Sequence, residues 1–141
     1  MTEDPVNVYY ARVRSYQTDL NGVMYHAAYF DAFDDARIET FRRLEYTYVD
    51  MLDEGWNLVI RRVACEYHSP ARMDDLLAIT VLVDRLTAAT LTFGYECRRD
   101  DALLALAHNT YAFLDARGRP TRIPERLRRL IEETPAFAYC R

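Results

Sequence analysis

The sequence predicts an α+β domain in which one antiparallel sheet of about five strands wraps around a long central helix. The first observation is the order of the elements: one strand-like segment, one long helical segment, then four more strand-like segments. The second is that the helical segment is apolar on more than one side, which indicates a helix packed on several faces. The chain has 141 residues, half of them apolar. We therefore expect residues 1–141 to form a single domain with its own core.

The first third of the chain supplies the first strand and the long helix. Residues 6–16 are rich in Val and Tyr, which favours a strand. Residues 26–44 carry side chains at helical spacing along one face, namely Tyr29, Phe33, Ala36, Thr40 and Leu44. Further apolar residues widen this face, so the helix is predicted to be buried.

The remainder predicts a short helix, a meander and a closing helix. The short helix covers residues 46–54, with Val49 and Leu52 facing inward and Gly55 ending it. Four runs rich in Val, Ile, Leu, Thr and aromatic residues then predict strands at 56–68, 76–86, 90–98 and 103–115. Residues 123–133 carry Leu and Ile on one face and predict the last helix.

The charged residues exclude several classes of function. All 18 basic residues are Arg, because the chain contains no Lys. Schiff-base chemistry and Walker-type phosphate loops both need a Lys and are therefore excluded. The net charge of −4 argues against a nucleic-acid partner. The arginines remain suited to bidentate binding of phosphate groups.

The cysteines and the N-terminus indicate a cytoplasmic protein. Cys65, Cys97 and Cys140 are odd in number and far apart, which is typical of reduced thiols. The N-terminal segment MTEDPVNVYY lacks the basic and apolar regions of a signal peptide. The longest apolar run, 102–107, is far too short to span a bilayer. We expect no membrane contact, no metal and no other cofactor.

The stretch from Tyr16 to Phe33 carries the candidate chemistry, because it joins a strand to the long helix. If the helix begins near Tyr25 or His26, its first backbone N–H groups lack partners and carry about half a positive charge. Such groups stabilise an oxyanion. Asp19 precedes them and is placed to activate water or to attack a carbonyl carbon itself. This pattern suits hydrolysis of an acyl group.

Both candidate residues also have structural interpretations. Asn21–Gly22 is the strongest hairpin-turn dipeptide, and Asp is common in turns and caps, so Asp19 alternatively only holds a turn. His26 alternatively caps the helix. The helical period that follows favours a bend from the sheet edge into the helix over a hairpin at Asn21–Gly22. Residue types alone leave both roles of Asp19 open.

The motif as a whole resembles a known family. The stretch YQTDLNGVMYHAAYFDAFDDAR is similar to the signature of the hotdog-fold acyl-CoA thioesterases, in the branch of 4-hydroxybenzoyl-CoA thioesterase and its Tol–Pal-associated relatives. The matching positions are Asp19, Gly22, Val23, Tyr25, His26, Ala27 and Tyr29. The similarity continues through IRRVACEYHSPARMDDLLAITVLV and FLDARGRPTRIP, in the family's order.

The resemblance implies an assembly and an activity. The fold it implies is the hotdog fold, assembled as a homodimer or homotetramer with active sites at the subunit interface. The activity it implies is hydrolysis of an acyl-CoA to the free acid and CoA. Asp19 matches the catalytic carboxylate, as general base or as nucleophile, and the backbone N–H of His26 matches the oxyanion donor. The His26 side chain is expected to assist placement of the substrate or protonation of the leaving thiolate.

The resemblance also implies substrate-binding positions. Gly22 lets the backbone approach the ligand. Tyr25 and Tyr29 are expected to line the acyl pocket, with core packing as their alternative. The family's own CoA contacts vary, so candidates for the CoA phosphates are chosen as arginines in or beside the predicted strands and turns: Arg61, Arg62, Arg72, Arg98 and Arg99. Each of them alternatively lies on the surface or pairs with an acid.

Three other functions remain open from the sequence. A non-catalytic hotdog module would bind an acyl thioester or a protein without turnover. A thioesterase for acyl-carrier-protein or polyketide thioesters is a further alternative, although relatives of that kind often lack the Asp retained here as Asp19. A hotdog dehydratase or hydratase is disfavoured by the same motif. The sequence does not identify the acyl group.

Overall fold

The computed structural model describes residues 4–139 and has the predicted α+β architecture. Its strands are β1 (Val8–Arg12), β2 (Trp56–Tyr67), β3 (Leu76–Leu86), β4 (Thr90–Arg99), β5 (Ala102–Asp115) and β6 (Pro120–Thr121). Its helices are α1 (Ala28–Arg43), α2 (Tyr48–Asp53) and α3 (Glu125–Glu132), with 3-10 turns η1 (Ser15–Gln17) and η2 (Pro135–Phe137). Across residues 4–139, no helix is both long enough and apolar enough to cross a membrane.

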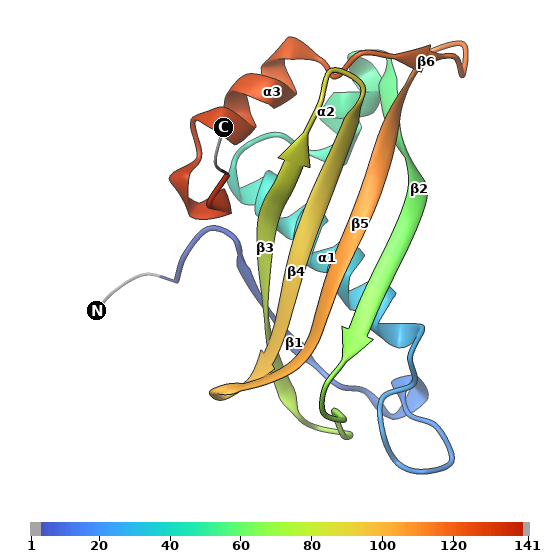
Figure 1. The fold of residues 1–141 in the computed structure, drawn as a ribbon, viewed down its shortest axis with the longest axis vertical. Coiled ribbons are helices and arrows are strands. Elements are labelled where there is room, and N and C mark those ends of the chain that lie inside the picture. The colour runs from blue at the N-terminus through green and yellow to red at the C-terminus, as the bar shows by residue number, and fades with distance from the viewer. Residues whose placement is uncertain (1–3, 140–141) are drawn as a thin grey trace.

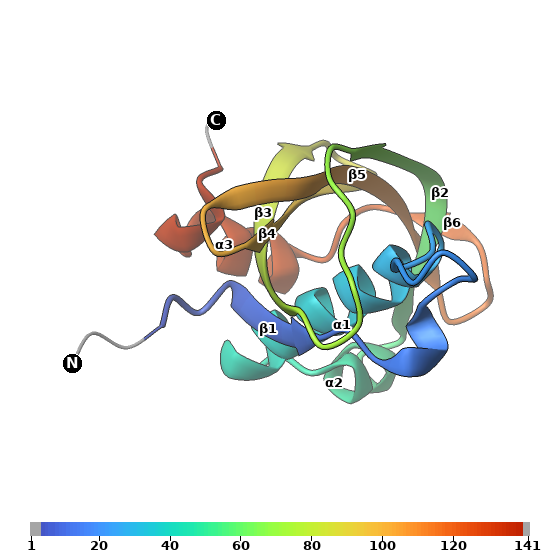
Figure 2. The ribbon, with the colours of Figure 1, turned by 90° about the horizontal axis from the view of Figure 1, so that it is seen from below.

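The strands form one antiparallel sheet in the order β1-β3-β4-β5-β2, with β6 paired to the end of β5. Strands β3, β4 and β5 form the predicted meander, but β2 does not pair with β3. It lies at the far edge and pairs with β5, because the link over residues 68–75 carries the chain past the start of α1. Figure 1 shows β1 and β2 at opposite edges of the sheet with α1 behind it, and Figure 2 shows the sheet curving around α1.

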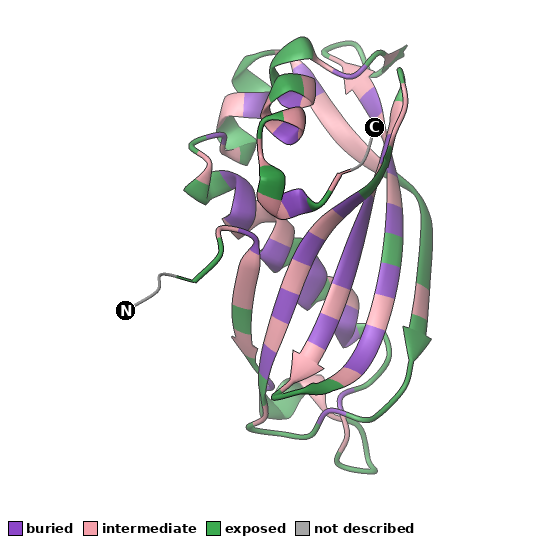
Figure 3. Ribbon diagram, turned by 60° about the vertical axis from the view of Figure 1, so that its left-hand side comes forward, coloured by how far each residue is buried: buried purple, intermediate pink, exposed green. Residues whose placement is uncertain are grey.

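The core lies between α1 and the concave face of the sheet. Seven side chains of α1 are buried, including Phe33 and Ala36, which confirms that the helix packs on several sides. Phe33 stacks on Tyr95 of β4 with ring centroids 4.9 Å apart. Along β3, β4 and β5, buried and less buried residues largely alternate, as expected where one face of a strand meets the core (Figure 3).

Two local predictions were wrong in detail. The first strand is shorter than residues 6–16, because the Gln17 side chain accepts the Arg14 backbone N–H and turns the chain into η1. In α2 the buried residue is Met51, whereas Val49 and Leu52 are 63% and 46% exposed. Met51 lies about 200° around the helix from Val49, so these two side chains cannot share a face.

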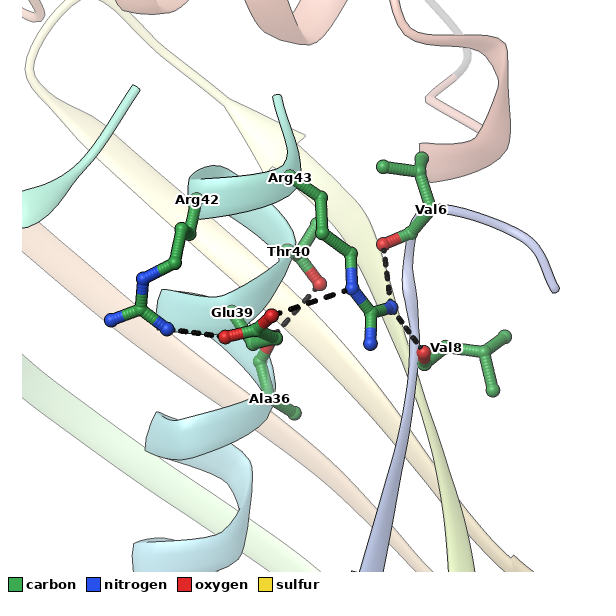
Figure 4. Close-up of polar contacts among 7 residues, drawn as sticks. All are labelled: Val6, Val8, Ala36, Glu39, Thr40, Arg42 and Arg43. Carbon is green, nitrogen blue, oxygen red and sulfur yellow. Dashed lines mark hydrogen bonds and ion pairs between the residues drawn. The ribbon is translucent and has the colours of Figure 1, made fainter. Parts of the chain in front are cut away.

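The C-terminal end of α1 is anchored to the beginning of the chain (Figure 4). The Arg43 guanidinium donates to the carbonyl oxygens of Val8, at 2.6 Å, and Val6, at 3.3 Å. Glu39, one turn earlier, holds the same guanidinium at 3.6 Å and also pairs with Arg42. These contacts hold α1 against the β1 edge of the sheet. They therefore also restrict the position of the N-terminal end of α1.

Candidate functional site

The Asp19 motif forms a small hairpin before the helix. Thr18 and Met24 form an antiparallel bridge, and the Asp19 N–H donates to the Val23 carbonyl at 2.9 Å. The Gly22 N–H donates to the Asp19 carbonyl at 3.0 Å, and Gly22 has φ +76°, a conformation that glycine adopts without strain. The hairpin that the Asn-Gly dipeptide signals is therefore present, and the expected simple bend into the helix was wrong.

The Asp19 carboxylate stabilises this turn and also faces solvent. Its Oδ1 atom accepts the backbone N–H of Asn21 at 2.8 Å and that of Val23 at 3.4 Å. Among residues 4–139, no group donates to Oδ2. Asp19 is exposed. The turn-holding role of Asp19 is thus observed, and the second oxygen leaves the carboxylate open to a water molecule or a substrate.

The helix starts later than expected, yet unpaired N–H groups are present ahead of it. Helix α1 begins at Ala28, and the preceding Ala27 offers no side-chain cap. The Tyr25 N–H donates to the Gln17 carbonyl, and the Ala28 N–H donates to the Tyr25 carbonyl, both at 3.0 Å. Within the described chain, the N–H groups of His26 and Ala27 have no acceptor. They lie at the positive end of a helix of 16 residues, where an oxyanion is stabilised.

A pocket of about 270 Å³ opens at this helix start. Its walls include His26 and Tyr29 from the motif, and Tyr67, His68 and Pro70 from the end of β2 and the link that follows. The Tyr67 hydroxyl donates to the His26 carbonyl at 2.7 Å. The Tyr29 and Tyr67 rings meet edge to face at 5.2 Å. This pocket is therefore built from two segments about 40 residues apart in sequence.

The two tyrosines of the pocket remain neutral. Burial raises the pKa of Tyr29, which outweighs the lowering effect of its hydrogen bond from the Ala71 backbone N–H. Burial also raises the pKa of Tyr67, as does its contact with Cys65. Both hydroxyls therefore act as hydrogen-bond donors or acceptors rather than as bases.

The predicted site residues do not all meet at this pocket. Tyr29 lines it and is only 2% exposed, whereas Tyr25 is 38% exposed and meets the His26 ring edge-on at 6.4 Å. The His26 ring makes no hydrogen bond to residues 4–139, so the structure does not support its capping alternative. Asp19 and Gly22 lie in the adjacent turn and do not line the pocket.

The candidate arginines lie in three separate places. Arg98 pairs with Glu96 at 3.8 Å, and Arg99 pairs with Asp75 at 2.8 Å, which is the acid-paired alternative. Arg72 lies beside the Asp19 turn, because it forms an antiparallel bridge with Val23. Arg61 and Arg62 line a separate pocket across the sheet.

The sequence interpretation missed Tyr67, His68 and Pro70 as parts of the site. All three fall within the stretch IRRVACEYHSPARMDDLLAITVLV, which resembles the family but gave no candidate site residue at these three positions. Their contact with the helix start depends on β2 lying at the edge of the sheet, which no local pattern encodes. The local signal was the EYHSPAR sequence, which spans the end of β2 and the link that follows.

Comparisons with known proteins identify the family of the chain. Residues 13–131 match the family model described as thioesterase-like superfamily. The chain is 31% identical to a putative esterase of Aquifex aeolicus over 89% of this chain and 98% of that one. It is 32% identical to the acyl-CoA thioesterase YbgC of Haemophilus influenzae over 88% of this chain and 89% of that one.

Solved structures share the fold. The crystal structure of a hypothetical protein from Aquifex aeolicus superposes with a TM-score of 0.84 at 30% identity, covering 88% of this chain and 98% of that one. A probable thioesterase from Bartonella henselae gives a TM-score of 0.78 at 27% identity, covering 83% and 98%.

Proposed function

The chain belongs to the thioesterase-like superfamily and is a hotdog-fold thioester hydrolase, and we propose that it hydrolyses a small or medium acyl-CoA to the free acid and CoA. The observation that carries the proposal is the pair of unpaired N–H groups at His26 and Ala27, beside a pocket and next to the Asp19 turn. The acyl-CoA thioesterase of Haemophilus influenzae supports the CoA substrate. Within the superfamily, the Asp19-to-Tyr29 motif supports the branch of 4-hydroxybenzoyl-CoA thioesterase and its Tol–Pal-associated relatives.

Asp19 supplies the nucleophile in one of two ways. As general base, Oδ2 takes a proton from water while the water oxygen attacks the thioester carbon, and CoA leaves as the thiolate. As nucleophile, Oδ2 attacks the thioester carbon, the C–S bond breaks and CoA leaves as the thiolate, and water then hydrolyses the mixed anhydride to the free acid and the Asp19 carboxylate. In both routes negative charge develops on the thioester oxygen. The His26 and Ala27 N–H groups stabilise that charge, and loss of one such donor typically costs about 10²- to 10³-fold in rate.

The surrounding side chains place the substrate. Tyr29 and Tyr67 bound the space beside the thioester, and the exposed Tyr25 lies against the His26 ring, where it is available to contact the acyl group. The His26 imidazole is exposed and unpaired within the described residues, so it is available to protonate the leaving thiolate. Gly22 leaves the turn without a side chain, so its backbone stays open to a ligand. Its φ of +76° rather than crowding favours glycine there, since an added Cβ would meet no atom within 4 Å. Arg72, beside the turn, and Arg61, on β2, are the candidates for the CoA phosphates.

A second copy of the chain completes the assembly. Strand β2 is an edge strand, so one side of its backbone lacks a partner strand in the described chain. Its large exposed apolar residues are Ile60 (51%), Val63 (51%) and Tyr67 (45%). An open edge with apolar side chains favours pairing with another strand. The proposal is a homodimer joined through β2, or a homotetramer of such dimers, that acts in the cytoplasm.

Thiol release from a panel of aromatic, short-chain and medium-chain acyl-CoAs tests the proposal. We expect turnover of at least one substrate and its loss in Asp19→Asn and Asp19→Ala. Including the same acyl groups on an acyl carrier protein separates the CoA substrate from the carrier-protein alternative. Turnover unaffected by both substitutions would remove Asp19 from the mechanism. Binding of acyl-CoA without any turnover would support the non-catalytic module instead.

A further inference from the structure

A row of polar residues crosses the outer face of the sheet, which Figure 1 shows facing the viewer. The register places Arg85 of β3 opposite Thr92 of β4, Thr92 opposite Thr110 of β5, and Thr110 opposite Arg62 of β2. Residues next to Thr92 and Thr110 in their strands are buried in the core, so the threonines point to the other face. The row therefore has an arginine at each end and hydroxyl groups between them.

Two β-bulges shape this row. The register shifts between Ile60 and Arg62 in β2 and between Val83 and Arg85 in β3. In a regular strand Arg61 and Arg62 would point to opposite faces. The bulge adds one residue to the strand, and both arginines line the same pocket. The guanidinium of Arg61 thus lies in the same pocket as those of Arg62 and Arg85, which end the row.

The pocket between these side chains has a volume of about 380 Å³. This lies within the range of roughly 300–1,000 Å³ that is typical of small-molecule sites. Within residues 4–139, its other lining residues are all threonines, namely Thr87, Thr90, Thr92 and Thr110. The Thr92 and Thr110 hydroxyl oxygens lie 2.9 Å apart and share one hydrogen, so one O–H of the pair remains free to donate.

The three guanidiniums have no protein counter-charge. None of them makes a hydrogen bond or ion pair with any residue from 4 to 139. The nearest acid in sequence, Asp84, is held by the His108 imidazole instead. Gly94 allows this arrangement, because a Cβ there would lie 2.6 Å from Asp84 Oδ1. Three like charges around one pocket repel each other unless an anion lies between them.

We propose that this pocket binds the phosphate groups of a ligand that carries at least two of them. Each guanidinium can grip a phosphate through two parallel N–H bonds, and the free threonine O–H adds a donor. The phosphates come from the nucleotide end of CoA or from a free phosphate compound such as pyrophosphate. Binding of the CoA phosphates rests on the proposed function, whereas binding of a free phosphate compound does not.

Equilibrium titration calorimetry on the full chain tests this site. The probes are pyrophosphate, CoA, 3′-dephospho-CoA and pantetheine, which carries no phosphate. The double variant Arg62→Gln/Arg85→Gln, called the row variant below, removes the charge at both ends of the row. The control Arg42→Gln/Arg129→Gln removes the same charge from two exposed arginines that are paired on helices. Size-exclusion chromatography with light scattering follows the mass of each variant.

The expected result is that the row variant binds CoA or pyrophosphate at least about 100-fold more weakly, since each charged hydrogen bond contributes about a tenfold factor or more. The control changes affinity less than twofold to threefold, and pantetheine binding is equal in all variants. If the row variant loses affinity only for CoA and dephospho-CoA, the site binds the nucleotide end of CoA. If it loses affinity for pyrophosphate, and pyrophosphate does not compete with CoA, the site binds a free phosphate compound.

Equal affinity of the row variant and the wild type for every probe would overturn the site. So would a change of mass in the row variant without any change in affinity, because the arginines would then pair across a subunit interface. CoA is a product and contains no thioester. A variant can therefore lose CoA binding and still hydrolyse acyl-CoA, or keep CoA binding and lose hydrolysis. The binding test is thus separate from the hydrolysis test of the proposed function.

Discussion

The Tyr67 hydroxyl, at the end of β2, donates to the carbonyl oxygen of His26 at 2.7 Å. This carbonyl shares a planar peptide group with the Ala27 N–H, so the hydrogen bond fixes the direction in which that N–H points. The neighbouring peptide is held in a similar way, because the Tyr25 carbonyl accepts the Ala28 N–H and shares its plane with the His26 N–H. The two unpaired donors of the candidate site are thus oriented before any ligand arrives.

Tyr67→Phe tests this positioning role. The substitution keeps the ring against Tyr29 and removes the hydrogen bond to His26, together with the contact between the hydroxyl and Cys65. A hydrogen bond of about 0.5–1.5 kcal/mol corresponds to a fall in kcat of about 2- to 12-fold, with KM nearly unchanged, because the donors act mainly on the developing charge. Tyr10→Phe, which loses a 3.3 Å bond to Asp4, is the matched control. Equal kcat in both variants would contradict the role.

The two roles of Asp19 are separable by stability measurements. Asp19→Asn keeps a side-chain oxygen for the Asn21 N–H, so we expect the free energy of unfolding to change by less than about 0.5 kcal/mol. Asp19→Ala leaves the N–H groups of Asn21 and Val23 without this acceptor and should cost about 1 kcal/mol. Urea unfolding measures both values. Equal stability of the two variants would show that the turn does not need the side-chain acceptor.

Strong local patterns predicted most of the elements. The strand predicted at 76–86 has the same bounds as β3. The helix predicted at 26–44 is α1, which starts later, at Ala28, and ends earlier, at Arg43. The start of the helix was missed because Tyr25 donates its N–H to Gln17 across a small hairpin, which a helical period does not reveal.

Contacts between distant segments explain the remaining misses. The wall formed by Tyr67, and the pocket formed by Arg62 and Arg85, both depend on where β2 lies in the sheet. The arginine pocket also depends on two bulges. Bulges shift the alternation of side chains without leaving a clear signal in the residue types.

Gly94→Ala should destabilise the protein through Asp84. A Cβ at position 94 would lie 2.6 Å from Asp84 Oδ1, so the carboxylate would have to leave His108. We expect a cost of about 0.5–1 kcal/mol in the free energy of unfolding, because the clash falls on the end of an exposed side chain and the lost contact is a surface ion pair. In an Asp84→Ala background the same substitution should cost much less, because its clash partner is absent. An equal cost in both backgrounds would assign the effect to the backbone of β4 instead.

Asp75 should make stability fall at acidic pH. Partial burial raises its pKa, but the Arg72 backbone N–H and the Arg99 guanidinium, both at 2.8 Å, outweigh this and hold the pKa below the usual 3.8. In the pH range between the folded and unfolded pKa values, the unfolded state binds more protons. The stabilisation is therefore present in full above about pH 4 to 5 and is lost as the pH falls through the folded pKa.

The urea midpoint measured from pH 7 to pH 2 tests this contribution. Asp75→Asn should be less stable than the wild type at pH 7, because it loses the charge that pairs with Arg99. The difference between the two should shrink as the pH falls below about 4, since the wild-type carboxyl then becomes neutral as well. Asp74→Asn, the exposed neighbour, is the matched control and should follow the wild-type profile. A difference between Asp75→Asn and the wild type that stays constant across the range would mean that Asp75 stabilises the link without its charge.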